Sequence, residues 1–150
     1  MAALKKRYYP KIAEEVYLAT LDNGMSLSII KKKGFIEKAA FLSTNFGALD
    51  NRFYIDGKLQ TYPAGIAHFL EHKLFEDDQG RDVTLDFVKL GADVNAFTTL
   101  DRTTYYFSTI DHFEESLELL LKFTSEFTSS EDTVNHGKRI IEQEINMYQD

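Results

Sequence analysis

The 150-residue sequence contains no cysteine and only 4 histidines. Without thiols, disulfide bonds and thiolate chemistry are excluded, and a bound metal ion would need His, Asp or Glu ligands. Basic residues are also scarce, with 17 Lys and Arg against 24 Asp and Glu and a formal net charge of −7. We therefore expect neither nucleic acid nor a membrane surface as a partner, because binding to polyanions favours clustered Lys and Arg.

Long hydrophobic runs are absent as well. Every apolar segment is far shorter than the roughly 20 residues that a bilayer span needs. The one basic run, Lys5-Lys6-Arg7, is not followed by the apolar core of a signal peptide. We therefore expect a cytoplasmic protein. A hydrophobic fraction of 43% with 8 Tyr and 12 Phe is typical of a folded domain, and the length suits one domain rather than two.

The first half of the chain has the alternation and β-branched content of strands. Three segments share this pattern, at residues 15–21, 25–31 and 37–45. Asp22-Asn23-Gly24 lies between the first two and predicts a tight hairpin turn, because Asn and Gly tolerate positive φ. Residues 48–62 are irregular and contain turn signals such as Asp56-Gly57, so they are predicted to form a loop.

The second half alternates between helical and strand patterns. The predicted order is helix, helix, strand, strand, helix, helix, over residues 63–76, 82–90, 92–98, 103–108, 111–127 and 130–150. Pro63 is expected to open the first of these helices, and Asp111 with Glu114 is expected to form a capping box for the third. With no repeat or linker, this order predicts one α+β domain, a mostly antiparallel sheet with helices packed on it.

The strongest chemical signal is the motif His68-Phe69-Leu70-Glu71-His72 in the first predicted helix. Helix geometry places His68, Glu71 and His72 on one face. Two imidazoles at i and i+4 can bind one tetrahedral metal ion, which lowers the pKa of a bound water towards about 7. Glu71 precedes the second His, which is the inverted H-x-x-E-H order of the inverzincins, and can accept the proton of that water as a general base.

Spacing alone leaves other readings of these residues open. The alternative for the motif is a solvent-facing helix with two surface histidines. A catalytic zinc site usually has three protein ligands, and Glu144 in the last predicted helix is a candidate for the third, although an exposed helix-face Glu is an equally good interpretation. His112 and His136 lie among charged residues at helix starts and are interpreted as surface residues.

Several motifs together resemble the pitrilysin/insulinase family of zinc metallopeptidases, which includes the mitochondrial processing peptidases and their bacterial counterparts. The segments that carry the resemblance are Leu21-Asp22-Asn23-Gly24, Gly65-Ile66-Ala67-His68-Phe69-Leu70-Glu71-His72, Gly91-Ala92-Asp93-Val94-Asn95-Ala96-Phe97-Thr98, Asp101-Arg102-Thr103, Tyr105-Tyr106-Phe107 and Ile140-Ile141-Glu142-Gln143-Glu144-Ile145. Residues 1–150 are therefore identified as an N-terminal zinc peptidase domain of the two-half bacterial type.

The resemblance implies the role of each matching residue. His68, His72 and Glu144 match the ligands of one Zn²⁺ per chain, and Glu71 matches the general base. Residues Asn95, Ala96 and Phe97 match a strand that meets the substrate, where an extended peptide can add by β-pairing. The implied function is that of a zinc-dependent metalloendopeptidase acting on extended peptides or unfolded polypeptide.

Two departures from the family pattern limit this expectation. Family members usually carry a Glu seven residues before the distal ligand, where this sequence has Gly137, so a supporting carboxylate is missing. Active members resemble a clamshell of two homologous halves, each larger than this chain. We therefore expect a truncated piece whose second half or partner subunit lies elsewhere, and which is inactive or weakly active alone.

The sequence leaves two alternatives to a metalloendopeptidase open. An S-ribosylhomocysteine lyase also uses an inverted motif, but that chemistry resembles one that needs cysteine, which this chain lacks. The other alternative is a non-catalytic zinc-binding subunit or interaction domain of the same family.

Overall fold

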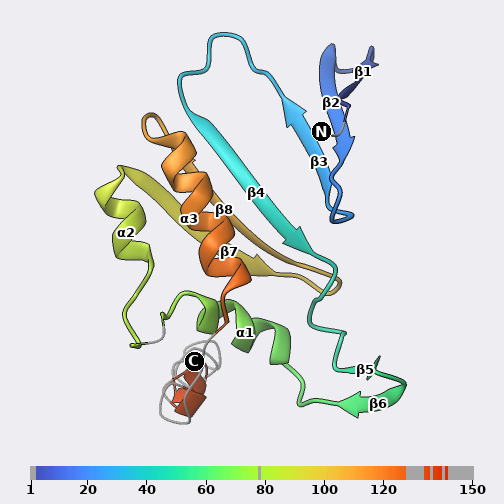
Figure 1. The fold of residues 1–150 in the computed structure, drawn as a ribbon, viewed down its shortest axis with the longest axis vertical. Coiled ribbons are helices and arrows are strands. Elements are labelled where there is room, and N and C mark those ends of the chain that lie inside the picture. The colour runs from blue at the N-terminus through green and yellow to red at the C-terminus, as the bar shows by residue number, and fades with distance from the viewer. Residues whose placement is uncertain (1–2, 78, 128–133, 136, 140, 142–150) are drawn as a thin grey trace, which may run out of the picture. The chain divides into compact units, whose positions relative to one another are not determined.

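The computed structural model describes residues 3–77, 79–127, 134–135, 137–139 and 141, and the structural statements below concern these residues. The chain divides into two compact units, Met1–Ile36 and Glu37–Asp150. Both are shown as a ribbon in Figure 1, and each is described by itself.

The first unit is a three-stranded antiparallel sheet in the order β1-β2-β3, formed by β1 (Lys5–Tyr9), β2 (Glu14–Thr20) and β3 (Ser26–Ile30). The predicted turn joins β2 to β3: the Leu21 N–H donates to the Met25 carbonyl at 2.8 Å, and Gly24 has φ of 86°. The basic N-terminal run was not predicted to be a strand, and the structure corrects this by placing it in β1. Charged side chains suit an edge strand because they discourage pairing with other chains.

The second unit contains the sheet that supports the candidate site. It consists of β4 (Lys38–Thr44), β7 (Ala92–Thr98) and β8 (Thr103–Thr109) in the order β4-β8-β7, all antiparallel. Helix α3 (Phe113–Ser125) packs on β4 and β8, and α2 (Thr84–Lys89) packs on β7, so that both cover one face of the sheet (Figure 1). The predicted α+β class with a mostly antiparallel sheet is confirmed.

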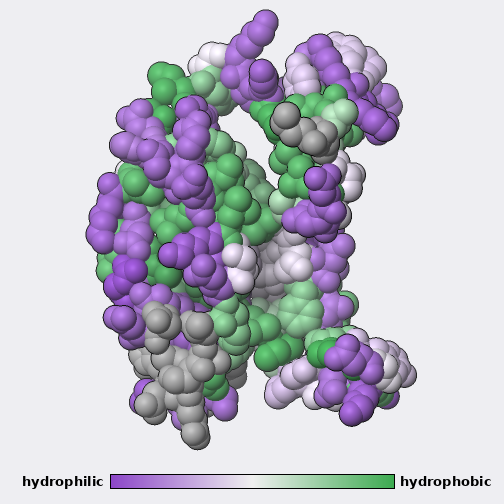
Figure 2. All heavy atoms as spheres, viewed as in Figure 1, coloured by the Kyte–Doolittle hydropathy of each residue, from purple (hydrophilic) through white to green (hydrophobic). Residues whose placement is uncertain are grey.

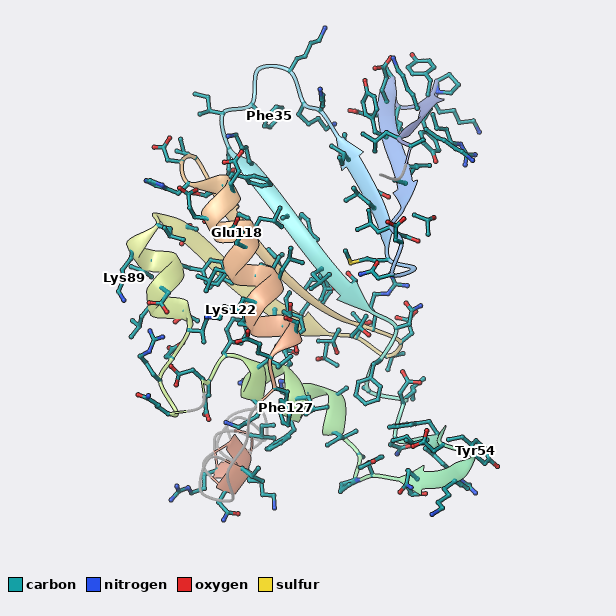
Figure 3. All side chains as sticks on the ribbon, in the orientation of Figure 1. Phe35, Tyr54, Lys89, Glu118, Lys122 and Phe127 are labelled. Carbon is teal, nitrogen blue, oxygen red and sulfur yellow. The ribbon has the colours of Figure 1, made fainter. Side chains whose placement is uncertain are left out.

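Aromatic side chains form the core between this sheet and its helices. Phe87 of α2 and Phe107 of β8 are both fully buried, with ring centroids 5.9 Å apart, and Phe123 of α3 packs edge-on against Phe87. The solvent side of the helices carries many polar side chains, as Figure 2 shows, although Leu85, Val88 and Leu121 are also exposed there. Lys89 of α2 and Glu118 and Lys122 of α3 are exposed and labelled in Figure 3. This amphipathic division explains the helical spacing in the sequence.

The prediction of a loop over residues 48–62 is wrong. This segment contains a two-stranded hairpin of β5 (Arg52–Ile55) and β6 (Lys58–Thr61). Asp56 and Gly57 connect the strands with φ of 49° and 76°, the left-handed pair of a type I′ turn, which matches the twist of a hairpin. The Asp-Gly pair was recognised as a turn signal, but the short alternating runs beside it were not recognised as strands.

Two helix starts also differ from expectation. Helix α1 covers Ile66–Leu74 rather than 63–76, because Gly65 at its N-terminus has φ of 86° and interrupts the helical backbone after Pro63. Helix α3 has no capping box. It begins one residue too late for Asp111 to cap it, and His112 occupies the N-cap position without a side-chain cap. The His112 ring instead contacts the Glu115 carboxylate at 3.4 Å.

The last predicted helix lies mostly outside the described residues, although positions 134, 135, 137–139 and 141 are helical. None of the helices in the described part of the chain is long and apolar enough to cross a membrane.

Candidate metal centre

Helix α1 brings the two motif histidines together. His68 and His72 lie one turn apart, with their Nε2 atoms separated by 3.0 Å and their ring centroids by 4.7 Å. Both rings are half-buried. Glu71 lies beside them and is only 8% exposed. One nitrogen from each His and one carboxylate oxygen of Glu71 all lie within 4.8 Å of one another.

This donor set fits a divalent metal ion. Zinc binds imidazole nitrogen at about 2.0–2.1 Å, so two ligands at the tetrahedral angle are separated by about 3.3 Å. The 3.0 Å between the two Nε2 atoms is close to that separation. Among the described residues, one group offers three potential ligand atoms within 4.8 Å of one another: His68, Glu71 and His72.

A hydroxyl from the sheet fixes the Glu71 carboxylate. The Thr98 hydroxyl, at the end of β7 and 27 residues further along the chain, donates to Glu71 Oε2 at 2.5 Å. Behind it, the Thr103 hydroxyl lies 3.3 Å from that of Thr98 and donates to the Phe46 carbonyl at 2.8 Å. Sequence reasoning did not identify Thr98 or Thr103, because threonine in a strand is ordinary and only the fold brings these two beside α1.

The surroundings of Glu71 are aromatic. Tyr105 of β8 is almost fully buried and packs against Phe75 and Phe123, with centroids 6.0 and 5.8 Å away. Burial raises the pKa of the Tyr105 phenol well above its ordinary value, and the negative charge of Glu71 raises it further. Tyr105 therefore stays neutral.

The predicted substrate-binding residues lie on the free edge of the sheet. Within the described part of the chain, β7 pairs only with β8. The Thr99 N–H donates to the Arg102 carbonyl at 2.8 Å, and the alternation of an antiparallel ladder then turns the backbone groups of Ala96 and Thr98 away from β8. The Ala96 N–H accordingly donates to Asn95 Oδ1 at 2.8 Å rather than to β8. Phe97 is 44% exposed.

The remaining candidate ligands divide into two groups. His112 is exposed at the start of α3, as expected for a surface residue. Glu144, proposed from the resemblance as the third ligand, lies outside the described residues, as do Glu142 and His136.

Gly137 has a packing role in the structure. It is buried, and a Cβ added to it would lie 3.2 Å from Cε2 of Phe69 in α1. A larger residue would require the Phe69 ring to shift by a few tenths of an ångström. The missing family glutamate is thus replaced by a close approach between residue 137 and the motif helix.

Comparisons with known proteins find zinc proteases among those that this chain resembles. A sequence profile of the insulinase family, described as peptidase family M16, matches residues 60–150. The chain is 45% identical over 149 residues to the uncharacterized zinc protease YmfH of Bacillus subtilis strain 168, an alignment that covers 98% of this chain and 35% of that protein. The chain therefore spans about a third of the length of this relative.

Solved structures match as well. A peptidase from Alicyclobacillus acidocaldarius, described as M16-like, aligns with a TM-score of 0.83 and 37% identity, covering 89% of this chain and 31% of that chain. Pitrilysin aligns with a TM-score of 0.76 over 99% of this chain and 16% of its own, and at 17% identity this match shows the fold alone.

Proposed function

This chain belongs to the insulinase family, peptidase family M16, and on that premise we propose that it carries the metal site and general base of a zinc-dependent metalloendopeptidase. The observation that carries the proposal is the His68–His72 pair, 3.0 Å apart at Nε2, with the buried Glu71 carboxylate beside it. A plain metal-binding domain has no need of a buried carboxylate beside the His pair that is hydrogen-bonded from another element. The geometry therefore favours catalysis over the non-catalytic alternative.

The chain's own residues perform the proton chemistry. His68 and His72 would hold one zinc ion, which would supply Lewis acidity, lower the pKa of water towards about 7 and polarise the substrate carbonyl. Glu71 accepts the proton of the attacking water at Oε1, because Oε2 is engaged by Thr98. Glu71 then transfers this proton to the leaving amine. Tyr105, held neutral by its raised pKa, does not compete for the proton.

We assign the third ligand to Glu144. Two histidines leave a catalytic zinc one protein ligand short. The sequence predicts Glu144, a carboxylate on a separate helix, as the ligand that completes the site. This expectation agrees with the family resemblance.

The substrate is an extended peptide or a segment of unfolded polypeptide that pairs with the free edge of β7. The outward-facing backbone groups of Ala96 and Thr98 offer the hydrogen bonds for such pairing. The Ala96 N–H donates to Asn95 Oδ1 in this structure. A bound peptide would replace Asn95 as the acceptor of this hydrogen bond. Phe97 offers an exposed aromatic surface to a neighbouring side chain.

Residues 1–150 act as the N-terminal zinc peptidase domain of a larger assembly in this proposal. The relative YmfH is about three times as long as the matched region. A homologous second half or a partner subunit would hold the substrate carbonyl and complete the site. Preorganised donors of that kind are often worth about 10²–10³-fold in rate.

The test is metal analysis of the purified full-length protein combined with cleavage of an unstructured peptide. We expect one zinc per chain, cleavage that stops on chelation, and recovery when zinc is restored. A protein that binds no divalent metal, or that cleaves equally well after chelation, would contradict the proposal.

A further inference from the structure

We propose that Thr98 is a positioning residue that holds the Glu71 carboxylate away from the metal and directs it towards the attacking water. This inference rests on the proposed function. It assigns a role to a residue outside the motif helix, through contacts that the motif itself does not predict.

Glu71 has two possible uses in this site, and only one permits catalysis. One of its oxygens lies within 4.8 Å of one nitrogen of each of His68 and His72, so it is itself a potential metal ligand. A carboxylate bound directly to the metal would occupy the water position and lose its basicity. Some contact must therefore keep Glu71 in the proton-accepting position, because electrostatic attraction alone draws the anion onto a divalent cation.

Thr98 supplies that contact. Its hydroxyl donates to Glu71 Oε2 at 2.5 Å, and hydrogen bonds to carboxylates are among the stronger ones in proteins. Glu71 is buried, so water competes little for this bond.

The hydroxyl of Thr98 is itself oriented by its neighbours. Thr103 uses its single proton on the Phe46 carbonyl at 2.8 Å, so towards Thr98 it can act only as an acceptor. The two hydroxyl oxygens are 3.3 Å apart, whereas Glu71 Oε2 is at 2.5 Å. The Thr98 proton therefore goes to Glu71.

The segment that anchors Thr103 is held tightly. Gly47 follows Phe46, and a Cβ at Gly47 would lie 2.4 Å from the Arg102 nitrogen in the β7–β8 turn. The next residue, Ala48, donates its N–H to the Thr99 carbonyl at 2.9 Å. These contacts fix the end of β7 where Thr98 lies, so that the position of the hydroxyl is set by backbone packing.

Thr98 also links the base to the peptide-binding edge. Its backbone groups face away from β8, where the proposed peptide pairs, while its side chain points to Glu71. A peptide that pairs with this edge restrains the residue that holds the base.

The experiment compares three variants of the full-length protein: Thr98→Val, Thr98→Ser and Thr104→Val. Valine keeps the shape and β-branching of threonine without the hydroxyl, and serine restores the hydroxyl. Thr104 is the matched control, because it is a buried threonine of the same hairpin whose hydroxyl bonds to Ser43 at 2.8 Å. For each variant, kcat and KM for an unstructured peptide, zinc affinity by chelator competition, and the thermal unfolding midpoint are measured.

We expect Thr98→Val to lower kcat by about 10- to 100-fold, the usual effect of removing a residue that orients a metal-site group. KM and the unfolding midpoint should stay near those of the wild type, and zinc affinity should be unchanged or tighter. Thr98→Ser should recover most of kcat, and Thr104→Val should not lower it. An unchanged kcat in Thr98→Val, or a loss of zinc affinity, overturns the proposal.

A spectroscopic measurement separates this inference from the proposed function. Cobalt(II) replaces zinc in such sites, and its visible absorption reports the coordination number and ligands. If Thr98 holds Glu71 off the metal, Thr98→Val should change the cobalt spectrum, and adding Glu71→Gln to it should abolish that change. This result would support the positioning role even if the wild type cleaved no peptide. Identical spectra for wild type and Thr98→Val, or a wild type that binds no cobalt, would reject it.

Discussion

Helix α1 buries two charged side chains, and their different partners suggest different uses. Glu71 is 8% exposed and Lys73 is 1% exposed. Two residues apart, they point about 200° from each other around the helix axis. Glu71 receives its hydrogen bond from the neutral hydroxyl of Thr98, whereas the Lys73 amine forms an ion pair with Glu76 at 2.5 Å.

The two residues differ in their partners: Lys73 has a partner of opposite charge, whereas Glu71 has a hydroxyl. The Lys73–Glu76 pair has no net charge, which is the usual way to tolerate an amine in the interior. The Glu71 carboxylate is instead hydrogen-bonded by the Thr98 hydroxyl and lies beside two imidazoles, although burying a carboxylate is costly. A stability function accounts for the first pair, and a reactive function accounts for the second.

The largest expected effect is on the rate of peptide cleavage and comes from replacing the Glu71 carboxylate. Glu71→Gln keeps the shape and can still accept a hydrogen bond from Thr98, but it cannot accept a proton. Loss of a general base costs typically about 10²–10⁴-fold. We expect the full-length variant to lose peptide cleavage by that factor, measured as kcat, while it still binds zinc.

Glu118→Gln is the control, because Glu118 is an exposed carboxylate on α3 that should not affect cleavage (Figure 3). Cleavage by Glu71→Gln close to the wild-type rate would remove Glu71 from the mechanism and leave its burial without a functional explanation.

Replacing Lys73 should change the stability of the fold rather than the rate of cleavage. Lys73→Met leaves Glu76, whose side chain is only 15% exposed, without its counter-charge. Breaking a buried pair in this way costs about 3 kcal/mol of unfolding free energy. The double variant Lys73→Met/Glu76→Gln should regain most of the loss, because no charge is then left uncompensated. Chemical denaturation measures both values.

Zinc affinity is the second measurement on these variants. It should match the wild type in both, because Lys73 faces away from the histidine pair. A Lys73→Met protein as stable as the wild type would show that Glu76 is well solvated, and the two halves of the comparison would no longer differ.

The sequence predicted the position of Glu71 beside the two histidines, but it predicted neither the hydrogen-bond partner of Glu71 nor the burial of Lys73. His68, Glu71 and His72 could be placed on one face because helical spacing is a local property, and the structure brings them together. The partner of Glu71 is 27 residues away and could not be found from spacing. Lys73 was not singled out either, because lysine is normally exposed on a helix.

The same division holds for the fold. The β7 limits were predicted as the structure has them, because Gly91 and the next turn mark both ends. The β5–β6 hairpin was missed because strands of 4 residues give too few alternations to be separated from a loop. Helix α1 was drawn too long, since a glycine with positive φ cannot be identified from sequence alone.

The identity of the third ligand decides whether Glu71 is available for chemistry. If Glu144 completes the site, Glu144→Gln should weaken zinc binding by about 10-fold or more, since a charged ligand is lost. Glu142→Gln serves as the matched control on the same segment and should bind zinc normally. Calorimetric titration of zinc into both variants makes the comparison. Unchanged affinity in Glu144→Gln would instead favour Glu71 itself as a ligand.

The smallest effect is expected at the surface, where charges are neither buried nor isolated. Arg81 donates to Asp77 at 3.0 Å and to Asp86 at 2.8 Å in the connection between α1 and α2. Hydrogen bonds lower the pKa of both carboxyls. For Asp77 the main donor is the Arg81 backbone N–H, and for Asp86 it is Lys89, followed by the Arg81 side chain.

A lowered carboxyl pKa stabilises the fold at pH values above the unfolded pKa of about 3.9. This contribution is lost as pH falls through the folded pKa. Arg81→Gln should therefore lower the unfolding midpoint slightly at pH 7, and the difference from the wild type should vanish as pH falls below the folded pKa values. Solvent screens these exposed pairs, so the loss at pH 7 should be far smaller than that of Lys73→Met. A comparable loss would mean that exposure does not separate these ion pairs, and that the contrast drawn on α1 reflects something other than burial.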